Sequence, residues 1–264
     1  MHLVKLINTM MIICRIAKAP QILRPRIQCN IISTNITKLT STLLPSSLST
    51  KKRSLLESGI VGSGVVVVRV SMMSSGTHDG RFALSETSTL ILKKGNITQW
   101  FVDGSSDAIV NPANERMLGG GGADGAIHRA AGPELREACY KVPEVRPGVR
   151  CPTGEARITP GFKLPASYVI HTVGPIYDMD SNPQASLRSA YENSLKVAKE
   201  KNIQYIAFTA ISCGVYGYPF EEAATIAIST IKEFANYFKE VHFVLFSDEI
   251  YNVWLVKAKE MLQT

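Results

Sequence analysis

Two glycine-rich stretches contain the residue types that could bind a phosphate-bearing ligand and act on it. The first, Asn111–Gly132, holds four consecutive glycines followed closely by Asp124. The second, Ser212–Pro219, reads SCGVYGYP. Because glycine tolerates positive φ and has no Cβ, backbone N–H groups can approach a ligand closely at such places. Where a loop of this kind leads into a helix, its amides and the helix N-terminus form an anion site.

Two such loops side by side would hold a diphosphate from both sides. Hydrogen bonds to charged groups contribute roughly 1.5–3 kcal/mol each, so a few backbone donors suffice without a lysine. The commoner phosphate motifs are excluded, because the chain has no G-x-x-x-x-G-K-[ST] sequence. Gly120–Gly125 does fit G-x-G-x-x-G. However, Glu144, the acid at the distance that a dinucleotide site requires, lies in a proline-broken segment and not in a strand.

The side chains around the first loop have structural as well as chemical interpretations. From the residues alone, Asp124 is either a helix N-cap or a catalytic carboxylate. Asn114 either caps a turn or contacts the ligand. Asn111 is interpreted as the partner in an internal loop hydrogen bond. His128 and His171 are interpreted as structural residues, His171 within a strand of the core.

Strands alternate with helices along residues 76–264. Apolar runs predict strands at Ser88–Gly95, Asp107–Asn111, Glu155–Gly161, Ser167–Gly174, Ile203–Ile211 and Val241–Ser247. Helical periodicity predicts helices at Gln184–Glu200, Phe220–Phe238 and Glu249–Leu262. This alternation indicates one α/β domain with helices on both faces of a sheet. Ligands of such sheets bind beyond the carboxyl ends of the strands, where both glycine-rich loops follow.

The positive charge of the chain belongs to its first part. The formal net charge is +7, but residues 1–75 carry ten Lys and Arg against one acid, Glu57. Residues 76–264 carry 19 Lys and Arg against 21 acids. This second part has no excess positive charge with which to release counterions from DNA or RNA, so nucleic acid is not expected as its partner.

Residues 1–75 are predicted to be a leader, and residues 76–264 the functional domain. The leader is rich in Ser, Thr, Lys and Arg, and its beginning fits a basic amphipathic stretch. This composition is typical of an organelle transit peptide, which predicts a mitochondrial or plastid location. The alternative is an unprocessed extension on a protein of the cytosol or nucleus. The apolar run IVGSGVVVVRV is too short to span a membrane, so no membrane association is expected.

The cysteines of the second part predict no metal site. Cys139, Cys151 and Cys213 are scattered, without a C-x-x-C pair or zinc-like spacing to histidine. Cys213 follows a strand beside a glycine-rich turn, which raises the possibility of a nucleophile. We interpret it as a plain small side chain, since no histidine is near in the sequence.

The motifs DAIVNPAN…GGGGADGAIHRAAG, YVIHTVGP and ISCGVYGYP together resemble the macrodomain family, in the version of the MacroD-type ADP-ribose hydrolases. The resemblance extends from about Leu90 to the C-terminus. It implies a three-layer α/β/α fold around a mixed, about six-stranded sheet, with a cleft for ADP-ribose. It implies removal of mono-ADP-ribose from acidic side chains of proteins and deacetylation of O-acetyl-ADP-ribose. It implies no metal and no cofactor, and we expect a monomer.

The resemblance also implies roles for individual positions. Asn114 would hydrogen-bond the distal ribose, and Asp124 would orient or activate the attacking water. The first loop would line the phosphates and distal ribose with Ala113, Gly119, Gly120, Gly121, Gly122 and Ala123. The second loop would clamp the phosphates with Ser212, Gly214, Val215 and Tyr216. The nucleoside would lie against Asn96, Ile97 and Phe246.

Two positions depart from the family pattern, and two other functions stay open. The adenine-binding acid of the family falls on Asn96, which accepts hydrogen bonds without charge assistance. Pro112 replaces the usual alanine and removes one backbone donor near the ligand.

The same cleft would suit a non-catalytic ADP-ribose reader, which would not need Asp124 and Asn114, or a phosphatase acting on an ADP-ribose phosphate.

Overall fold

A computed structural model of the chain describes residues 60–61, 65–66 and 80–263. The chain divides into two units, Met1–Arg69 and Val70–Thr264. In the first unit, β1 (Ile60–Val61) and β2 (Val65–Val66) form an antiparallel pair. The rest of the predicted leader lies outside the described residues, so its targeting role stays a prediction. In the part of the chain that the structure describes, no helix is long and apolar enough to cross a membrane.

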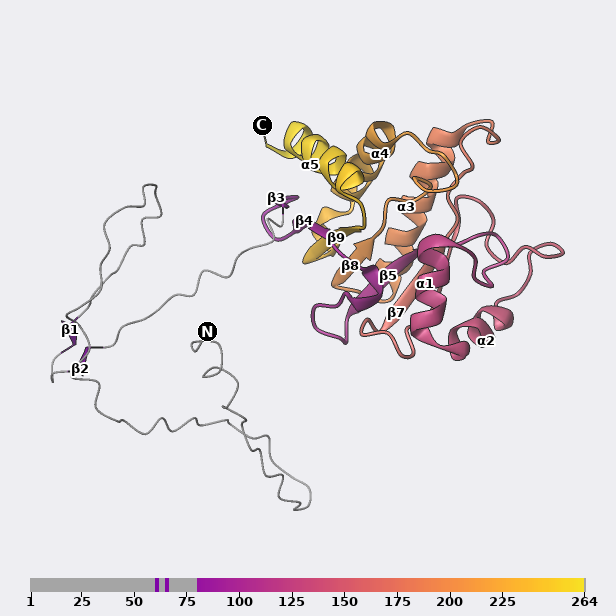
Figure 1. Cartoon of the computed structure of the whole chain (residues 1–264), viewed down its shortest axis with the longest axis horizontal. Helices are drawn as coiled ribbons and strands as arrows, with labels where there is room; N and C mark the ends of the chain where they lie inside the picture. Colours follow the sequence, from indigo (N-terminus) through magenta and orange to yellow (C-terminus); the bar gives the residue numbers. More distant parts are fainter. Residues whose placement is uncertain (1–59, 62–64, 67–79, 264) are drawn as a thin grey trace, which may run out of the picture. The chain divides into compact units, whose positions relative to one another are not determined.

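The second unit is built on a seven-stranded mixed sheet (Figure 1). Its strands are β3 (Gly80–Ala83), β4 (Thr89–Lys94), β5 (Asp107–Pro112), β6 (Ala156–Pro160), β7 (Tyr168–Thr172), β8 (Tyr205–Phe208) and β9 (Glu240–Leu245). They are ordered β3-β4-β9-β8-β5-β7-β6, and only the edge strands β3 and β6 run antiparallel to their neighbours. The expected sheet is confirmed, with β3 as the strand that the sequence did not predict.

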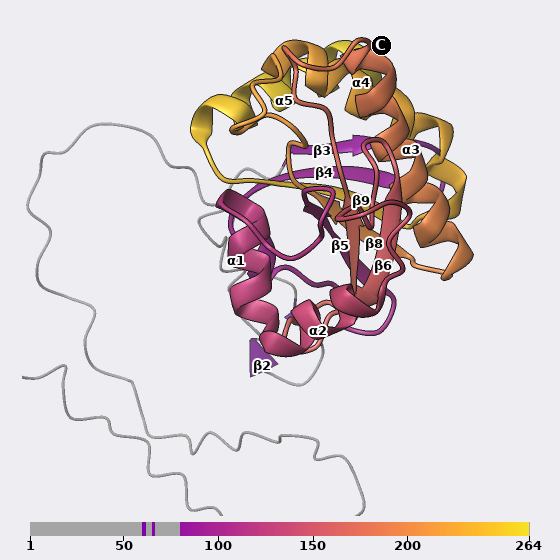
Figure 2. The same ribbon diagram turned by 90° about the vertical axis from the view of Figure 1, so that its right-hand side faces the viewer.

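Helices cover both faces of this sheet, as the two views at right angles show (Figures 1 and 2). On one face lie α1 (Gly122–Ala131) and α2 (Pro133–Lys141). On the other lie α3 (Pro183–Glu200), α4 (Phe220–Glu233) and α5 (Asp248–Leu262). The described residues of this unit also form two short 3-10 helices, η1 (Ile97–Gln99) and η2 (Ala235–Tyr237). The three-layer α/β/α prediction is therefore confirmed.

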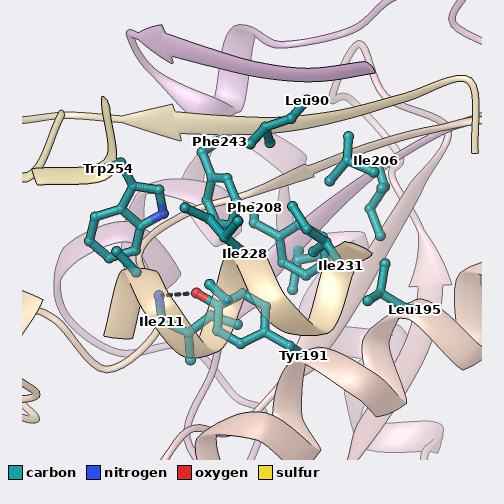
Figure 3. Packing of buried hydrophobic residues seen from close by; sticks show 14 of the residues in the cluster. Leu90, Tyr191, Leu195, Ile206, Phe208, Ile211, Ile228, Ile231, Phe243 and Trp254 are labelled. Atoms are coloured by element: carbon teal, nitrogen blue, oxygen red, sulfur yellow. Dashed lines mark hydrogen bonds between the residues drawn. The ribbon is translucent and has the colours of Figure 1, made fainter. Parts of the chain in front are cut away.

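The central strands are apolar throughout because both of their faces are covered. In β5, Ala108 and Val110 join the core beneath α3–α5, whereas Ile109 joins the core beneath α1 and α2. The larger core contains an aromatic cluster in which Tyr191, Phe208 and Phe243 pack together, with Trp254 beyond Phe243 (Figure 3). All four side chains are fully buried, which fixes the helices against the sheet.

Two helices differ from the prediction. The helix α2 was not predicted; it starts at Pro133, a residue with helical φ that needs no amide partner at this position. The helix α4 ends at Glu233 instead of Phe238, because the chain turns through η2 to enter β9 at Glu240.

The parallel arrangement of β4, β9, β8, β5 and β7 brings their carboxyl ends to one edge of the sheet. The segments that follow them, including both glycine-rich loops, therefore lie at this edge. One of these loops is joined directly to the core, because the N–H of Ile211 donates to the Tyr191 hydroxyl over 3.3 Å (Figure 3). The strand β8 thus leads into the second loop from a fixed starting point.

Replacement of Tyr191 by Phe tests this connection. Tyr191→Phe leaves the buried N–H of Ile211 without its acceptor, which costs about 1–3 kcal/mol of unfolding free energy. For a domain of this size the melting temperature should fall roughly 2–4 °C per kcal/mol. Thermal unfolding followed by circular dichroism measures the loss. Tyr237→Phe is the control, because Tyr237 is exposed. Equal stability of the two variants would contradict a structural role for the bond.

Candidate functional site

A cavity of about 330 Å³ lies between the two glycine-rich loops. Most of the predicted site residues line it: Ala113, Asn114, Gly120, Gly121, Gly122, Ala123, Asp124, Ser212, Gly214, Val215 and Tyr216. The sheet places them together, because β5 and β8 are hydrogen-bonded neighbours and end side by side. Among the residues that the structure describes, no Lys or Arg lines this cavity.

Backbone amides supply the electrophilic walls of the cavity. The helix α1 begins at Gly122, and its N-cap, Gly121, offers no side chain to the first-turn N–H groups. Those groups and the positive end of the helix therefore remain available to an anion. Across the cavity, the N–H groups of Gly214, Val215 and Tyr216 have no hydrogen-bond acceptor among the described residues. The two loops thus present backbone donors from both sides of the cavity, and anion binding there stays a prediction.

The second loop owes its shape to a residue in an uncommon conformation. Ser212 has φ of +65°, a left-handed value that few residues other than glycine adopt. Its carbonyl accepts from the N–H of Tyr218 over 3.0 Å, and the N–H of Gly217 donates to the carbonyl of Gly214. These bonds close the loop on itself and leave the intervening amides for a ligand.

Asp124 lies in the first turn of α1 but does not cap it. Its side chain is buried, and Oδ1 accepts from Asn111 Nδ2 over 2.8 Å. Oδ2 has no partner among the described residues. Burial raises the pKa of this carboxyl, against the opposing effects of the Asn111 hydrogen bond and of His128. Asp124 is therefore a desolvated carboxylate with one free oxygen and a stronger base than an exposed aspartate.

A line of hydrogen bonds behind Asp124 fixes Asn111. Asn111 is buried in β5, within the strand expected from the sequence, and its predicted internal hydrogen bond joins it to Asp124; its Nδ2 also approaches His171 Nδ1 at 3.1 Å. His171 Nε2 is 2.9 Å from Thr159 Oγ1. Burial lowers the pKa of His171 to about 3, so the ring is neutral, accepts at Nδ1 and donates from Nε2. The prediction of a core histidine agrees with this placement.

Half-buried His128 and buried Cys139 and His171 approach the arrangement of a metal site. Ligand atoms of His128, Cys139 and His171 lie within 4.8 Å of one another. Burial raises the pKa of the Cys139 thiol to about 12 and lowers the pKa of His128. His171 is also hydrogen-bonded to Asn111 and Thr159, and Asn111 in turn holds Asp124. We therefore interpret the three groups as uncharged side chains that support the position of Asp124. Metal independence of the reaction stays a prediction.

Asn114 and Asp124 converge above Gly120. A Cβ on Gly120 would stand 3.1 Å from Asp124 Oδ2 and 3.2 Å from Asn114 Nδ2. Asn114 also shapes its own turn, because its Oδ1 accepts from the N–H of Arg116 and its Nδ2 donates to the carbonyl of Gly119. Asn114 therefore caps a turn, as one interpretation held, and also lines the cavity; its contact with a ligand stays a prediction. One Nδ2 hydrogen remains for a ligand.

At two positions only glycine fits, because another segment of the chain lies where a Cβ atom would stand. A Cβ on Gly125 would overlap the carbonyl oxygen of Gly120, so α1 can pack against the glycine run only with glycine here. A Cβ on Gly174 would overlap the Ser212 hydroxyl. Gly174 follows β7, lines the cavity and thereby sets the spacing between the β7 segment and the second loop.

A second cavity of about 480 Å³ adjoins the first and shares Gly122, Ala123 and Gly214 with it. Its walls include the predicted nucleoside-binding residues Asn96, Ile97 and Phe246. Ile97 is buried, whereas Phe246 is 89% exposed and offers its ring to a ligand. Asn96 caps η1, since its Oδ1 accepts from the N–H and the hydroxyl of Thr98. The group of Asn96 that remains for a ligand is therefore the Nδ2 donor.

Comparison with known proteins decides the family. The sequence model of the Macro domain matches residues 110–227. A macro domain-containing protein of Vibrio parahaemolyticus is 53% identical over 163 residues, which are 62% of this chain and 93% of that protein. The chain belongs to the macro domain family. The resemblance drawn from the loop motifs is confirmed.

Other relatives of this macrodomain carry functional names or ligands. The O-acetyl-ADP-ribose deacetylase of Escherichia fergusonii is 50% identical over 160 residues, 59% of this chain and 87% of that protein. The Oceanobacillus iheyensis macrodomain solved with ADP has a TM-score of 0.63 at 41% identity, covering 69% of this chain and 96% of that one. The Trypanosoma brucei macrodomain in complex with ADP-ribose has a TM-score of 0.54 at 38% identity, covering 63% and 68%.

One predicted residue of this macrodomain lies apart, and two relevant residues were not predicted. Gly119 lines neither cavity; a Cβ there would meet the His128 ring at 3.4 Å, and its carbonyl holds Asn114. Gly174 and Asn111 were missed as site residues. Both stand at the ends of strands that neighbour each other in the sheet, and this position is the signal that would have indicated them.

A change at Gly121 tests the anion site. A Cβ at Gly121 meets no atom within 4 Å and the residue is exposed, so Gly121→Glu should fold normally. Its carboxylate would project among the amides and repel phosphate. The affinity for ADP-ribose, measured by titration calorimetry, should fall at least about tenfold.

Gly121→Ala is the matched control, because the methyl group adds neither charge nor reach. It should retain most of the affinity for ADP-ribose. Native affinity in a folded Gly121→Glu variant would show that the phosphates do not lie along this loop.

Proposed function

We propose that this macrodomain binds ADP-ribose and hydrolyses esters on its distal ribose. The substrates would be proteins mono-ADP-ribosylated on acidic side chains, and O-acetyl-ADP-ribose. The observation that carries the proposal is the pair of polar atoms above Gly120. The unpartnered Oδ2 of buried Asp124 and the Nδ2 of Asn114 converge there, at the edge of an anion site built from neutral amides.

The placement of the ligand follows from the two cavities. The adenosine would occupy the cavity with Ile97 and Phe246, and the diphosphate would lie between the amides of α1 and those of Gly214–Tyr216. The distal ribose would then reach Asn114 and Asp124. The Asn114 amide would donate to a ribose oxygen, so the ester is presented next to the free carboxylate oxygen.

The carboxylate of Asp124 would act on the attacking water. The water oxygen attacks the acyl carbon or the anomeric carbon, and the proton of the water passes to Asp124 or to a substrate phosphate oxygen. The ester C–O bond then breaks: after attack at the acyl carbon the departing ribose oxygen takes this proton back, and after attack at the anomeric carbon the carboxylate departs without one. General base catalysis contributes roughly 10²–10⁴-fold, and the raised pKa of Asp124 favours it. The line from Thr159 through His171 to Asn111 would hold the carboxylate in place.

A change at Asp124 distinguishes a hydrolase from a reader of ADP-ribose. Asp124→Ala should keep ADP-ribose affinity within about tenfold and lower turnover by roughly 10²–10⁴-fold. Calorimetry measures the affinity. Release of ADP-ribose from a glutamate-linked mono-ADP-ribosylated protein and deacetylation of O-acetyl-ADP-ribose measure the turnover.

Asp124→Asn is the matched control for the fold. Its amide oxygen still accepts from Asn111. Burying the neutral amide also avoids the free-energy cost of burying an ionised carboxylate. Because the folded state disfavours the ionised carboxylate at neutral pH, this variant should melt no lower than the wild type. Unchanged turnover in both variants would sink the catalytic assignment. Binding without turnover in the wild type would favour the reader.

Asn96 offers a test of the adenine end. Asn96→Asp would keep one oxygen on Thr98 and turn a second, charged acceptor toward the exocyclic amino group of adenine. ADP-ribose affinity should rise roughly fivefold, corresponding to about 1 kcal/mol. Turnover at saturating substrate should stay the same, because the adenine end is remote from the ester.

An inosine analogue of ADP-ribose is the control ligand, since it presents a carbonyl oxygen in place of the amino group. Asn96→Asp should bind it more weakly than the wild type does. Equal affinities of both proteins for both ligands would remove Asn96 from the adenine pocket.

A further inference from the structure

A third cavity, of about 370 Å³, opens on the far side of Asn114. It shares Asn114, Gly174 and Tyr216 with the central cavity. The central cavity in turn shares Gly122, Ala123 and Gly214 with the cavity around Phe246. The three spaces therefore follow one another, with the central cavity in the middle and Asn114 at the boundary to the third.

This succession gives the third cavity a definite relation to the substrate. The inference rests on the proposed function, in which adenosine, diphosphate and distal ribose fill the first two cavities. The ester on the distal ribose then stands at Asn114, and the acyl group must extend away from the ribose into the third cavity. An acetyl group would fill little of this space, whereas a glutamate side chain with its peptide would enter it.

Two charged side chains, Glu115 and Arg116, line the third cavity. They differ in whether an ion pair balances their charge. The negative charge of Glu115 is balanced by an ion pair, because its carboxylate lies 3.1 Å from the Arg146 guanidinium. The carboxylate also accepts from the N–H of Thr153 over 3.2 Å. The guanidinium of Arg116 is exposed and forms no ion pair with any residue that the structure describes. Arg116 is thus the uncompensated charge at this end of the groove.

The backbone of Arg116 is held firmly beside the reaction centre. Its N–H donates to Asn114 Oδ1 over 3.1 Å, and its carbonyl accepts from the Arg150 guanidinium over 3.3 Å. The following residue, Met117, is fully buried and has a positive φ of 61°, which closes the turn. The side chain of Arg116 therefore starts from a fixed point, two residues from Asn114. Ile176, 41% exposed, adds apolar surface to the same cavity.

We propose that the third cavity binds the acceptor segment of an ADP-ribosylated protein and that Arg116 favours segments with a carboxylate beside the modified residue. The apolar surface of Ile176 would contact the peptide, and the guanidinium of Arg116 would pair with the neighbouring acid. The preferred substrate is then a protein modified within an acidic stretch, not a free acyl ester.

Two glutamate-linked mono-ADP-ribosylated peptides test the proposal on the full chain. They are identical except that the residues flanking the modified glutamate are acidic in one and serine in the other. The wild type should show a higher kcat/KM for the acidic peptide by roughly fivefold, the upper range for an exposed ion pair, and added salt should reduce the difference. Arg116→Glu should abolish or invert this preference, and Arg116→Lys should keep part of it.

Arg81→Glu is the charge-matched control. Arg81 is exposed on the edge strand β3, which stands at the sheet edge remote from β5 and β7. This variant changes net charge equally and should retain the wild-type preference. Turnover of O-acetyl-ADP-ribose, measured in parallel, reports on the hydrolytic site without an acceptor peptide.

The outcomes separate this inference from the proposed function. An equal preference in wild type and Arg116→Glu, or no preference in the wild type, would overturn the acceptor site while leaving hydrolysis intact. A parallel loss on both peptides and on O-acetyl-ADP-ribose would assign Arg116 to the fold of the site and overturn its role in selection. If the wild type cleaves no ester at all, the proposed function fails, and the acceptor site falls with it.

Discussion

The hydrogen bond between Asn111 Nδ2 and Asp124 Oδ1 is the interaction on which the site depends. It joins the end of β5 to the first turn of α1 and gives a buried carboxylate a protein donor. A buried ionised carboxylate is costly unless it is paired or hydrogen-bonded. In this domain the nearest imidazole is His128, whose Nε2 lies 3.4 Å from Asp124 Oδ1, but burial lowers the pKa of that ring. The site therefore keeps a carboxylate whose charge is only partly compensated, which is the condition for a base of raised strength.

Glycine makes this arrangement possible at three separate contacts. The glycine run must pass close enough to α1 to meet Gly125, and close enough to Asp124 that a side chain on Gly120 would crowd both polar groups. Gly174 allows the segment after β7 to approach Ser212. The same absence of side chains leaves the first-turn amides of α1 uncapped. Relative to glycine, a capping side chain would stabilise this helix by only roughly a few tenths of a kcal/mol, so the domain loses little local stability by leaving these amides to a ligand.

The sequence was sufficient for the architecture because apolar runs and loop motifs are local. The strands buried on both faces, such as Val241–Ser247 and Ile203–Ile211, were predictable from their composition, and the glycine runs indicated where ligands bind. The edge strand β3 has four residues and mixed burial, so its pattern was too short to predict.

Contacts across the sheet were less accessible to sequence. Asn111 and His171 are sixty residues apart and meet only because β5 and β7 pair in parallel with these two residues in register. The capping role of Asn114 was one of two open interpretations, and the structure shows that one side chain serves the turn while facing the cavity. The sequence alone does not show that one side chain both caps a turn and lines a cavity, because this depends on the three-dimensional arrangement of the loop.

The absence of lysine and arginine from the walls of the central cavity bears on how the proposed chemistry would operate. Neutral amides would bind the diphosphate by hydrogen bonds and by the dipole of α1, without neutralising its charge. A bound ligand would then bring negative charge close to Asp124, and a nearby like charge raises the pKa of a carboxyl further. Substrate binding would thus strengthen the base that acts on it. A cation in the same wall would bind phosphate more tightly but would lower the pKa of Asp124. Neutral donors therefore bind the ligand less tightly but leave Asp124 the stronger base.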